Sequence, residues 1–365
     1  MPTQETQILD NIIASRRALL VGGGAALAAL ALPTAARAAN TVTSYTDNDI
    51  LNFALNLEYL EANFYYLAAF GTTIDVASSA STAANAAVLP IKGVVGSGAG
   101  TTTGIVANAG IAGAPASSTY KVPFANVAIA AYAVETAIEE GKHVAFLQSA
   151  LGSLAVAQPL MNLTPANMLA IATAAKVPTS YNFNPYMNDA FFLLGAYIFE
   201  DVGVSAYHGA APLIANKTTI LPAAAGIMAV EAYHAGLVRT SINANDNGTG
   251  ITAGFPAGTL TAVTGLISTF RAGAAAAIPQ SPANPEDPAL DDYGLATQMV
   301  TLNGGTVTAT QIVDVPPSIT GVSAPATAFA RSTSQVLNIV TGGGAVASGP
   351  AKGGFFPNGL NGLFI

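Results

Sequence analysis

The sequence predicts a mainly α fold, in which a four-helix bundle with one long crossover is followed by a smaller, irregular C-terminal appendage. Three observations lead to this prediction. Four long apolar segments are each bounded by residues typical of helix ends. Two of these segments carry the same Glu-x-x-His frame, and the other two each carry a glutamate at mid-length. Hydrophobic residues make up 51% of the 365-residue chain, which is enough apolar side chain for a large core.

The first helix is expected over residues 47–70. Thr46 and Asp49 have the spacing of a capping box, and Gly71 follows as a C-terminal stop. The next segment, residues 72–122, consists mostly of Gly, Ala, Ser, Thr and Val and has almost no charge. We expect it to be an insertion that covers the bundle as irregular or short extended structure.

The second helix is expected over residues 123–151, with Pro123 in its first turn and Gly152 beyond its end. Residues 152–184 are long enough to cross the bundle. Within them, Thr164 followed by proline predicts a short helix.

The third helix is expected to begin with Asn184 as its cap and to end near Gly209. The fourth is expected to start at Pro222 and to fade before the polar turn at residues 243–248. Residues 210–221 between them are short, so these two helices should be antiparallel neighbours. We therefore place the bundle at residues 42–245.

Residues 246–365 carry weaker signals and are expected to pack on the bundle as the C-terminal extension. A helix is expected over residues 259–277 with Arg271 facing outward, and a second one over residues 324–340. Residues 283–293 are acidic and contain prolines, which indicates a loop, and residues 306–315 alternate as a strand does.

The N-terminus has the pattern of an export signal. Arg16 and Arg17 precede an apolar run over residues 18–32, and an A-x-A cleavage motif follows at residues 36–38. The twin arginine resembles a Tat signal, and an ordinary Sec signal is the alternative. Residues 1–38 are therefore assigned to a signal peptide. The mature chain is expected to be periplasmic or extracellular in a bacterium. It is expected to have no transmembrane anchor, because no other stretch reads as long and apolar enough to cross a membrane.

Composition excludes several classes of function. The formal net charge of -8 gives no basic patch for nucleic acid, so a nucleic-acid partner is not expected. The absence of cysteine excludes disulfides, thiolate metal sites and cysteine nucleophiles. Only 9% of residues are charged, which favours either homo-oligomeric contacts or a surface rich in Ser, Thr, Asn and Gly.

The ionisable residues inside the four helices indicate a metal centre. Helical residues three apart share a face, so each Glu-x-x-His frame offers a carboxylate beside an imidazole. The four helices are apolar nearly all round, so we expect them to be buried on every side. A buried carboxylate is costly unless it is paired or binds a cation. Two divalent ions, Fe or Mn, would balance four glutamates, with neutral imidazoles completing the coordination. The alternative is a polar core layer in which these groups pair with one another or with tyrosines. The expected ligands are Glu58, Glu140, His143, Glu200, Glu231 and His234.

These motifs resemble a known family. Leu51-Asn52-x-x-Leu55-x-x-Glu58, followed by Tyr65, is similar to the first helix of bacterioferritin-type proteins, and the two Glu-x-x-His frames and Glu200 are similar to their other ligands. Residues 52–65 and 199–208 and the Gly-Gly-Phe-Phe-Pro-Asn-Gly tail resemble the exported ferritin-like proteins called desiccation-related. The resemblance implies a ferritin-like bundle in which the four glutamates are terminal or bridging ligands and the two histidines are nitrogen ligands. The long insertion and the C-terminal third argue against a 24-subunit cage.

Four residues are weaker candidates for the surroundings of the site. Glu61 lies three residues after Glu58 on the same face and could be a further ligand or a base in contact with the ligands. Tyr65 and Tyr207 each follow a ligand glutamate by seven residues, which suits core packing, a hydrogen bond to a ligand or a radical relay. His208 is expected to be a capping or hydrogen-bonded histidine rather than a ligand.

The leading hypothesis is an exported ferritin-like di-metal carboxylate protein that activates O2 or H2O2 or oxidises Fe(II), with the oxidant or metal ions as its small partners. The alternative is a non-enzymatic envelope or desiccation-stress protein with a structural or vestigial metal site.

Overall fold

The computed structural model describes residues 45–74, 120–278, 292, 294–302, 305–311, 328–343 and 351–363. The expected signal peptide, most of the insertion and most of the expected acidic loop lie outside the described residues. The expected mainly α fold is confirmed.

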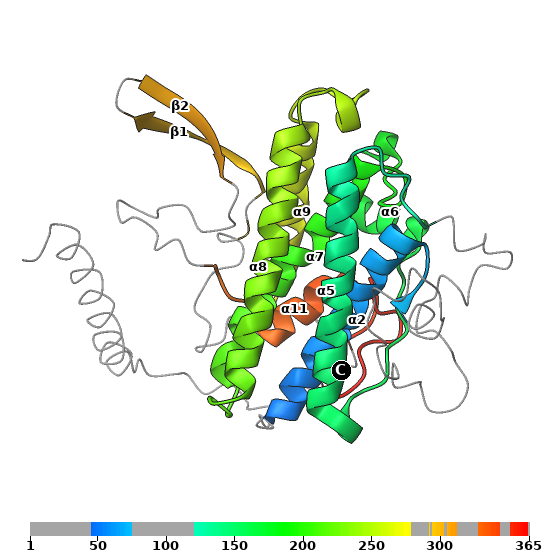
Figure 1. The fold of residues 1–365 in the computed structure, drawn as a ribbon, viewed down its shortest axis with the longest axis vertical. Coiled ribbons are helices and arrows are strands. Elements are labelled where there is room, and N and C mark those ends of the chain that lie inside the picture. Colours follow the sequence, from blue (N-terminus) through cyan, green and yellow to red (C-terminus); the bar gives the residue numbers. More distant parts are fainter. Residues whose placement is uncertain are drawn as a thin grey trace, which may run out of the picture. The chain divides into compact units, whose positions relative to one another are not determined.

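Four long helices form the bundle (Figure 1). They are α2 (Asp47–Phe70), α5 (Val127–Leu151), α7 (Asp189–Ala210) and α8 (Ile220–Asn245). Helix α2 packs mainly against α5, and α7 mainly against α8. The pairing of α7 with α8 confirms that these two helices are neighbours, as the short connection between them predicted.

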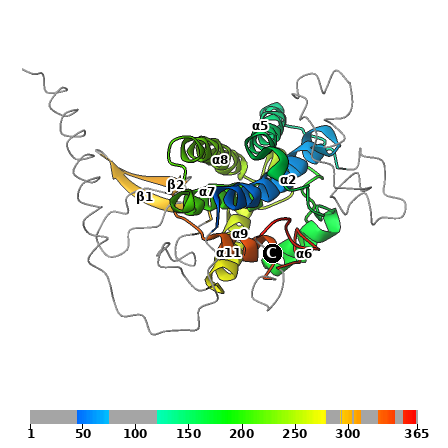
Figure 2. The same ribbon diagram turned by 90° about the horizontal axis from the view of Figure 1, so that it is seen from below.

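Seen along the bundle, the helices lie in layers (Figure 2). Helices α5 and α8 lie on one side of α2 and α7, while α9 (Thr259–Ala276) and α11 (Thr333–Val340) lie on the other side and contact α7. This arrangement explains why α7 is buried along nearly its whole length, and α2 along most of its length. The central layer therefore has to place its ionisable side chains against protein groups.

Helix boundaries follow the caps, and three helices start at other residues than predicted. The capping box of Thr46 and Asp49 and the left-handed Gly71 are present as predicted. Helix α5 does not begin at Pro123 but after Asn126, whose side chain accepts hydrogen bonds from two backbone N–H groups. Helix α7 begins after Asn188 rather than Asn184. Asn188 has the extended backbone of a cap and accepts the N–H of Phe191, while Asn184 forms a local turn with Tyr186. Helix α8 starts at Ile220, two residues before the predicted Pro222.

Short elements complete the described chain. The crossover contains the predicted helix α6 (Pro165–Ala174), capped by Thr164. The two antiparallel strands are β1 (Ala296–Leu302), which was not predicted, and β2 (Gly305–Gln311), where a strand was expected from residue 306. Helix α9 confirms the prediction closely, but α11 is much shorter than predicted, because residues 328–332 precede it as non-helical backbone. Single-turn 3₁₀ helices occur at Gly152–Leu154, Thr179–Tyr181, Ala211–Leu213 and Gly250–Thr252.

The C-terminal tail returns to the first helix. Asn361 and Asn56 exchange two side chain–backbone hydrogen bonds of 2.9 and 3.0 Å. The backbone of Phe355 bonds both to Val340 at the end of α11 and to Asn162 in the crossover. The tail thus fastens helix α2, the crossover and the C-terminal third to one another.

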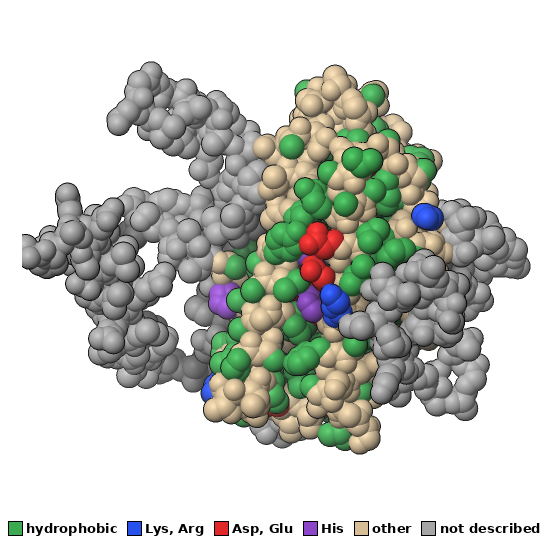
Figure 3. All heavy atoms as spheres, viewed as in Figure 1, with side chains coloured by type: hydrophobic (Ala, Val, Ile, Leu, Met, Phe, Trp, Pro, Cys, Tyr) green, Lys and Arg blue, Asp and Glu red, His purple; other side chains and the backbone are tan. Residues whose placement is uncertain are grey.

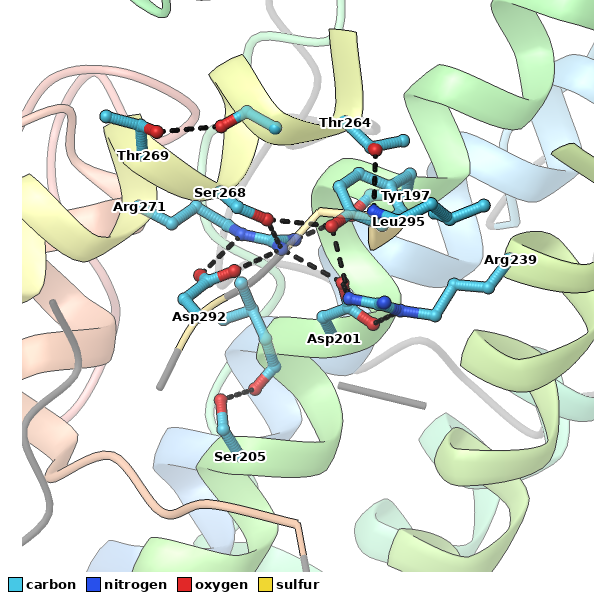
Figure 4. Close-up of polar contacts among 12 residues, drawn as sticks. Tyr197, Asp201, Ser205, Arg239, Thr264, Ser268, Thr269, Arg271, Asp292 and Leu295 are labelled. Atoms are coloured by element: carbon cyan, nitrogen blue, oxygen red, sulfur yellow. Dashed lines mark hydrogen bonds and ion pairs between the residues drawn. The ribbon is translucent and has the colours of Figure 1, made fainter. Parts of the chain in front are cut away.

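An arginine–aspartate network joins the bundle to the C-terminal third (Figure 4). Its five members are Asp201 of α7, Arg239 of α8, Arg271 of α9, Asp292 and Arg331, and all are buried. Asp201 accepts hydrogen bonds from both Arg239 and Arg271, and Asp292 accepts from both Arg271 and Arg331. The prediction that Arg271 faces outward was wrong, because these aspartates provide partners that let its charge be buried.

Two described helices, α7 and α8, are long and apolar enough by length and composition to cross a membrane, contrary to the expectation that no such stretch remained. In the apolar window of α7 every residue is buried, as in the core helix of a soluble protein, whereas only 28% of the window in α8 is buried. Helices α5 and α8 form an outer layer, so apolar side chains such as Val127 and Tyr233 are exposed. The expectation that all four helices are buried on every side was therefore wrong for this outer layer.

Candidate metal centre

The six expected ligands meet inside the bundle. Helix α2 contributes Glu58, α5 contributes Glu140 and His143, α7 contributes Glu200, and α8 contributes Glu231 and His234. His143 is 7% exposed as a whole residue, and the other five residues are at most 1% exposed. Each helix turns one face inward at the same depth, which is why residues three apart in α5 and α8 arrive together.

Two groups of ligand atoms can each hold a metal ion. Glu58, Glu140, His143 and Glu231 form the first, which we call position A, and Glu140, Glu200, Glu231 and His234 form the second, which we call position B. Within each group the ligand atoms lie within 4.8 Å of one another. Glu140 and Glu231 belong to both groups, as bridging carboxylates of a two-ion centre would.

At position A the imidazole of His143 is surrounded by carboxylates. Its Nδ1 atom lies 3.2 Å from Glu58 Oε2, 3.4 Å from Glu140 Oε2 and 3.4 Å from Glu231 Oε1. One ring nitrogen therefore points at the side chains of three different helices.

Position B repeats this arrangement from the other half of the bundle. Nδ1 of His234 lies 3.0 Å from Glu140 Oε1 and 3.5 Å from Glu200 Oε2. Glu140 takes part in both groups, since one of its oxygens faces each histidine.

Burial and mutual repulsion perturb the titration of these groups. Burial raises the pKa of Glu58 to about 7, although His143 opposes the shift. Burial and then the repulsion of the other carboxylates raise the pKa of Glu231 well above its usual value. Burial would also raise the pKa of Glu140, but His143 and His234 outweigh it and lower that pKa. The pKa of His234 is raised to about 12, because Glu200 and Glu140 outweigh the effect of burial.

The unsatisfied atoms of the cluster fit bound cations. Both carboxylate oxygens of Glu140 and of Glu231, one oxygen of Glu200 and Nδ1 of His234 are buried and have no hydrogen-bond partner. His234 Nδ1 is close to Glu140 without hydrogen-bond geometry, so proximity alone does not satisfy either atom. Buried polar atoms are normally hydrogen-bonded, and a cation is the partner that suits several facing acceptors at once. The donor set of carboxylates and imidazoles suits Fe or Mn.

The nearest cationic side chains do not replace such ions. Arg239 of α8 is bound to Asp201 by two hydrogen bonds of 2.9 and 3.0 Å. Lys142 is exposed on the outer face of α5. Neither side chain therefore pairs with the carboxylates of the cluster.

The two candidate tyrosines hydrogen-bond to the ligands across the bundle. The hydroxyl of Tyr65 on α2 donates to Glu200 on α7, and the hydroxyl of Tyr207 on α7 donates to Glu58 on α2. Burial, followed by the adjacent glutamates, raises the pKa of both tyrosines well above its usual value, which keeps both hydroxyls protonated as donors. Of the roles left open by the sequence, a hydrogen bond to a ligand is the one that the structure contains.

Glu61 lies beside the cluster but belongs to neither ligand group. A β-carbon built on Gly203 would overlap the Glu231 carboxylate and would lie 3.4 Å from Glu61 Oε1, so these two carboxylates flank the same glycine. Burial, and then Glu231, raises the pKa of Glu61 well above its usual value. The glycine at position 203 therefore leaves room for the Glu231 carboxylate.

His208 lies apart from the cluster, whereas Glu139 contacts one of the ligand histidines. His208 is partly buried in the last turn of α7 and occurs in neither ligand group. Glu139 was not among the candidate residues, but its Oε2 accepts a hydrogen bond of 2.8 Å from Nε2 of His234 on α8. Local spacing on α5 could not reveal this contact, because its partner belongs to another helix.

The outer end of the site reaches the surface between α5 and α8. Figure 3 shows acidic side chains gathered there with histidine and lysine. An open hollow on α5 is lined by Glu135, Glu139 and Lys142 among apolar residues. The side chain of Glu139 is 30% exposed, so it links the surface to a buried ligand.

Comparisons with known proteins agree with this geometry. Residues 46–244 match the family model described as "Ferritin-like domain". The chain is 29% identical over 195 residues to "Desiccation-related protein PCC13-62" of Craterostigma plantagineum. That match covers 53% of this chain and 52% of the relative, so it spans about half of each protein. Among solved structures, no significant match was found.

Proposed function

We propose a metal-dependent function for this chain, which belongs to the ferritin-like domain family. The chain binds two divalent metal ions in the buried cluster and uses them to handle oxygen or peroxide or to oxidise Fe(II). The observation that carries the proposal is the sharing of Glu140 and Glu231 by two four-residue ligand groups. Fe and Mn are the proposed metals, because both accept mixed carboxylate and imidazole ligands.

When bound, a pair of such ions supplies redox equivalents to a small oxidant. The protein contributes orientation and a dry environment. Tyr65 and Tyr207 hold the terminal carboxylates Glu200 and Glu58 by hydrogen bonds, which leaves the remaining carboxylate oxygens to face the metal positions. The ligands are at most 7% exposed, so bulk water has little access.

Metal analysis tests the binding step. Protein purified from its native host should carry about two Fe or Mn per chain, the number of ligand groups in the cluster. A Glu140→Ala, Glu231→Ala double variant, which removes both shared ligands, should lose the metal while keeping its helical content. Full metal content in that variant would contradict the proposed centre.

A second reading is a non-enzymatic stress protein whose metal ions only stabilise the bundle. It is favoured by the desiccation-related relative and by the four protein ligands available at each position. A catalytic site keeps a coordination position open, whereas a structural site is closed. Azide binding seen as a new absorption band, together with O2 release from H2O2, would support catalysis. A metal-loaded protein that shows neither would support the structural role.

We also propose that the chain is exported by a bacterium, because residues 1–38 have the pattern of a cleaved signal. The mass of the mature protein recovered from the periplasm or medium tests this, and an intact N-terminus on cytoplasmic protein would contradict it. Replacing Arg16 and Arg17 by lysines should block a twin-arginine route and leave a Sec route working.

A further inference from the structure

The ligand set of the cluster is built twice with the same spacings. On α2 and α7, a terminal glutamate is followed seven residues later by a tyrosine, and on α5 and α8, a bridging glutamate is followed three residues later by a histidine. The tyrosine contacts are reciprocal as well, since each hydroxyl donates to the terminal glutamate of the other helix. If these groups alone decided binding, positions A and B would bind metal equally well.

The equivalence ends at the outer nitrogens of the two histidines. Nε2 of His234 donates to Glu139 at 2.8 Å. For His143, the hydrogen bond and ion pairs seen among the described residues all involve Nδ1. The sequence explains the difference: Glu139 precedes Glu140, while Val230, which cannot accept a hydrogen bond, precedes Glu231.

The two histidines also differ in exposure. The side chain of His143 is 9% exposed and that of His234 is fully buried. At position A the ring can exchange hydrogen bonds with solvent. At position B it is enclosed and has a carboxylate partner from the protein.

A carboxylate on the outer nitrogen of a metal-binding histidine has known physical effects. It fixes the tautomer with the proton on that nitrogen, fixes the orientation of the ring and makes the inner nitrogen more basic. At position B the Nδ1 atom is thereby directed toward Glu140 and Glu200. At position A the tautomer and the ring angle of His143 are not fixed in this way, so ordering them has to accompany metal binding.

We propose that the two positions are unequal, so that position B (Glu140, Glu200, Glu231, His234) fills first and more tightly, and position A (Glu58, Glu140, His143, Glu231) fills second and exchanges its ion. Glu139 is the positioning residue that creates the difference, acting through His234. The inference rests on the proposed function, since it requires that the cluster bind two ions. Glu61 flanks the bridging Glu231 and so bears on both positions.

Titration of the metal-stripped full-length chain with Mn2+ tests the inference. Free Mn2+ is followed by its electron paramagnetic resonance signal. The native protein should bind two ions in two resolved steps. Glu139→Ala should weaken the first step about 10- to 100-fold, the usual effect of removing such a carboxylate, and bring the two steps together. Glu139→Gln, which keeps an acceptor without the charge, should give an intermediate affinity.

The chain offers a matched control and a direct assignment of the steps. Glu135 lies one turn before Glu139 on the same exposed side of α5 and contacts Tyr233 at 3.4 Å rather than a ligand. Glu135→Ala should leave both steps unchanged. His143→Ala should remove the weaker step and keep the tight one, whereas His234→Ala should remove the tight one.

Two outcomes separate this inference from the proposed function. Two equal steps in the native protein, or an unchanged first step in Glu139→Ala, would overturn the inequality while leaving a two-ion centre in place. A native protein that binds neither Mn2+ nor Fe2+ would overturn the proposed function and this inference with it.

Discussion

Replacing Asp201 by asparagine should weaken the attachment of the C-terminal third to the bundle. Asp201 is buried on α7 and accepts two hydrogen bonds from Arg239, of 3.0 and 2.9 Å, and one of 2.9 Å from Arg271. Asparagine has the same size, but it removes the negative charge and turns an N–H2 group toward guanidinium donors. The substitution therefore tests the electrostatics of the network without making a cavity.

Two estimates give the size of the effect. Burial raises the pKa of Asp201, but Arg239 and Arg271 outweigh it and hold it at about 2, against an ordinary value of 3.8. At about 1.4 kcal/mol per pH unit, this shift corresponds to about 2 kcal/mol in favour of the charged form. Removing one partner of a buried ion pair typically costs about 3–5 kcal/mol. The free energy of unfolding should thus fall by about 2–5 kcal/mol, which lowers Tm by roughly 4–20 °C.

Urea and thermal unfolding followed by circular dichroism at pH 7 measure this change. Glu135→Gln, which removes an exposed charge, should stay within about 0.5 kcal/mol of the native protein. An Asp201→Asn, Arg239→Met double variant should be less destabilised than the sum of the single variants, by about 0.5–3 kcal/mol. Because the pKa of Asp201 is lower in the folded state than in the unfolded state, the ionised carboxylate contributes to the free energy of unfolding above the unfolded-state pKa. This contribution is lost as the pH falls toward 2. Additive single variants, or an Asp201→Asn variant as stable as Glu135→Gln, would refute the reasoning.

Three further results are expected. Gly209→Ala should lower Tm, because the new β-carbon would overlap the backbone carbonyl of Arg331. Gly236→Ala on α8 has open space around it and should leave Tm unchanged or raise it. Equal melting temperatures of the two variants would contradict this reasoning. Gly203→Ala should reduce the bound metal measured by mass spectrometry, since the new β-carbon would overlap the Glu231 carboxylate, and native stoichiometry would count against the placement of that bridge. The metal-free protein should lose stability as the pH rises from 5 to 7, because burial raises the pKa of Glu58 from 4.5 to about 7, so the folded state binds more protons than the unfolded state in this window. The associated change in the free energy of unfolding between pH 5 and pH 7 is about 2 kcal/mol. Thermal melts should also show that added Mn2+ stabilises the protein more at pH 7 than at pH 5, and a metal-free Tm that rises over this range would contradict the assignment.

The elements and residues that local spacing determines could be predicted from the sequence. The capping box at Thr46, the stop at Gly71 and the Glu-x-x-His frames depend on residues three or four apart, which helical geometry relates directly. The convergence of Glu58 and Glu200 on those frames could be inferred because apolar helices have few places for a charge.

The features that were missed depend on contacts between distant segments. Arg271 was expected to be exposed because nothing near it in the sequence offers a buried partner, and its aspartates come from α7 and from Asp292. Helices α5 and α8 were expected to be buried on all sides because their composition is apolar, and only the layer order shows that their outer faces are exposed. The contact of Glu139 with His234 likewise joins two helices far apart in the sequence.

Helix α7 separates the two buried sets of charges. Glu200 and Asp201 are adjacent, and successive helical residues differ in direction by about 100°. Glu200 therefore faces the cluster with His234, while Asp201 faces Arg239 and Arg271 toward α9. Asp201 has arginine partners within the protein, and its carboxylate stays ionised without a metal. Among the described residues Glu200 faces a hydroxyl, a histidine and other glutamates, so its pKa is raised by burial. The same helix thus presents one carboxylate whose charge the protein balances and one whose charge is left for bound cations to balance.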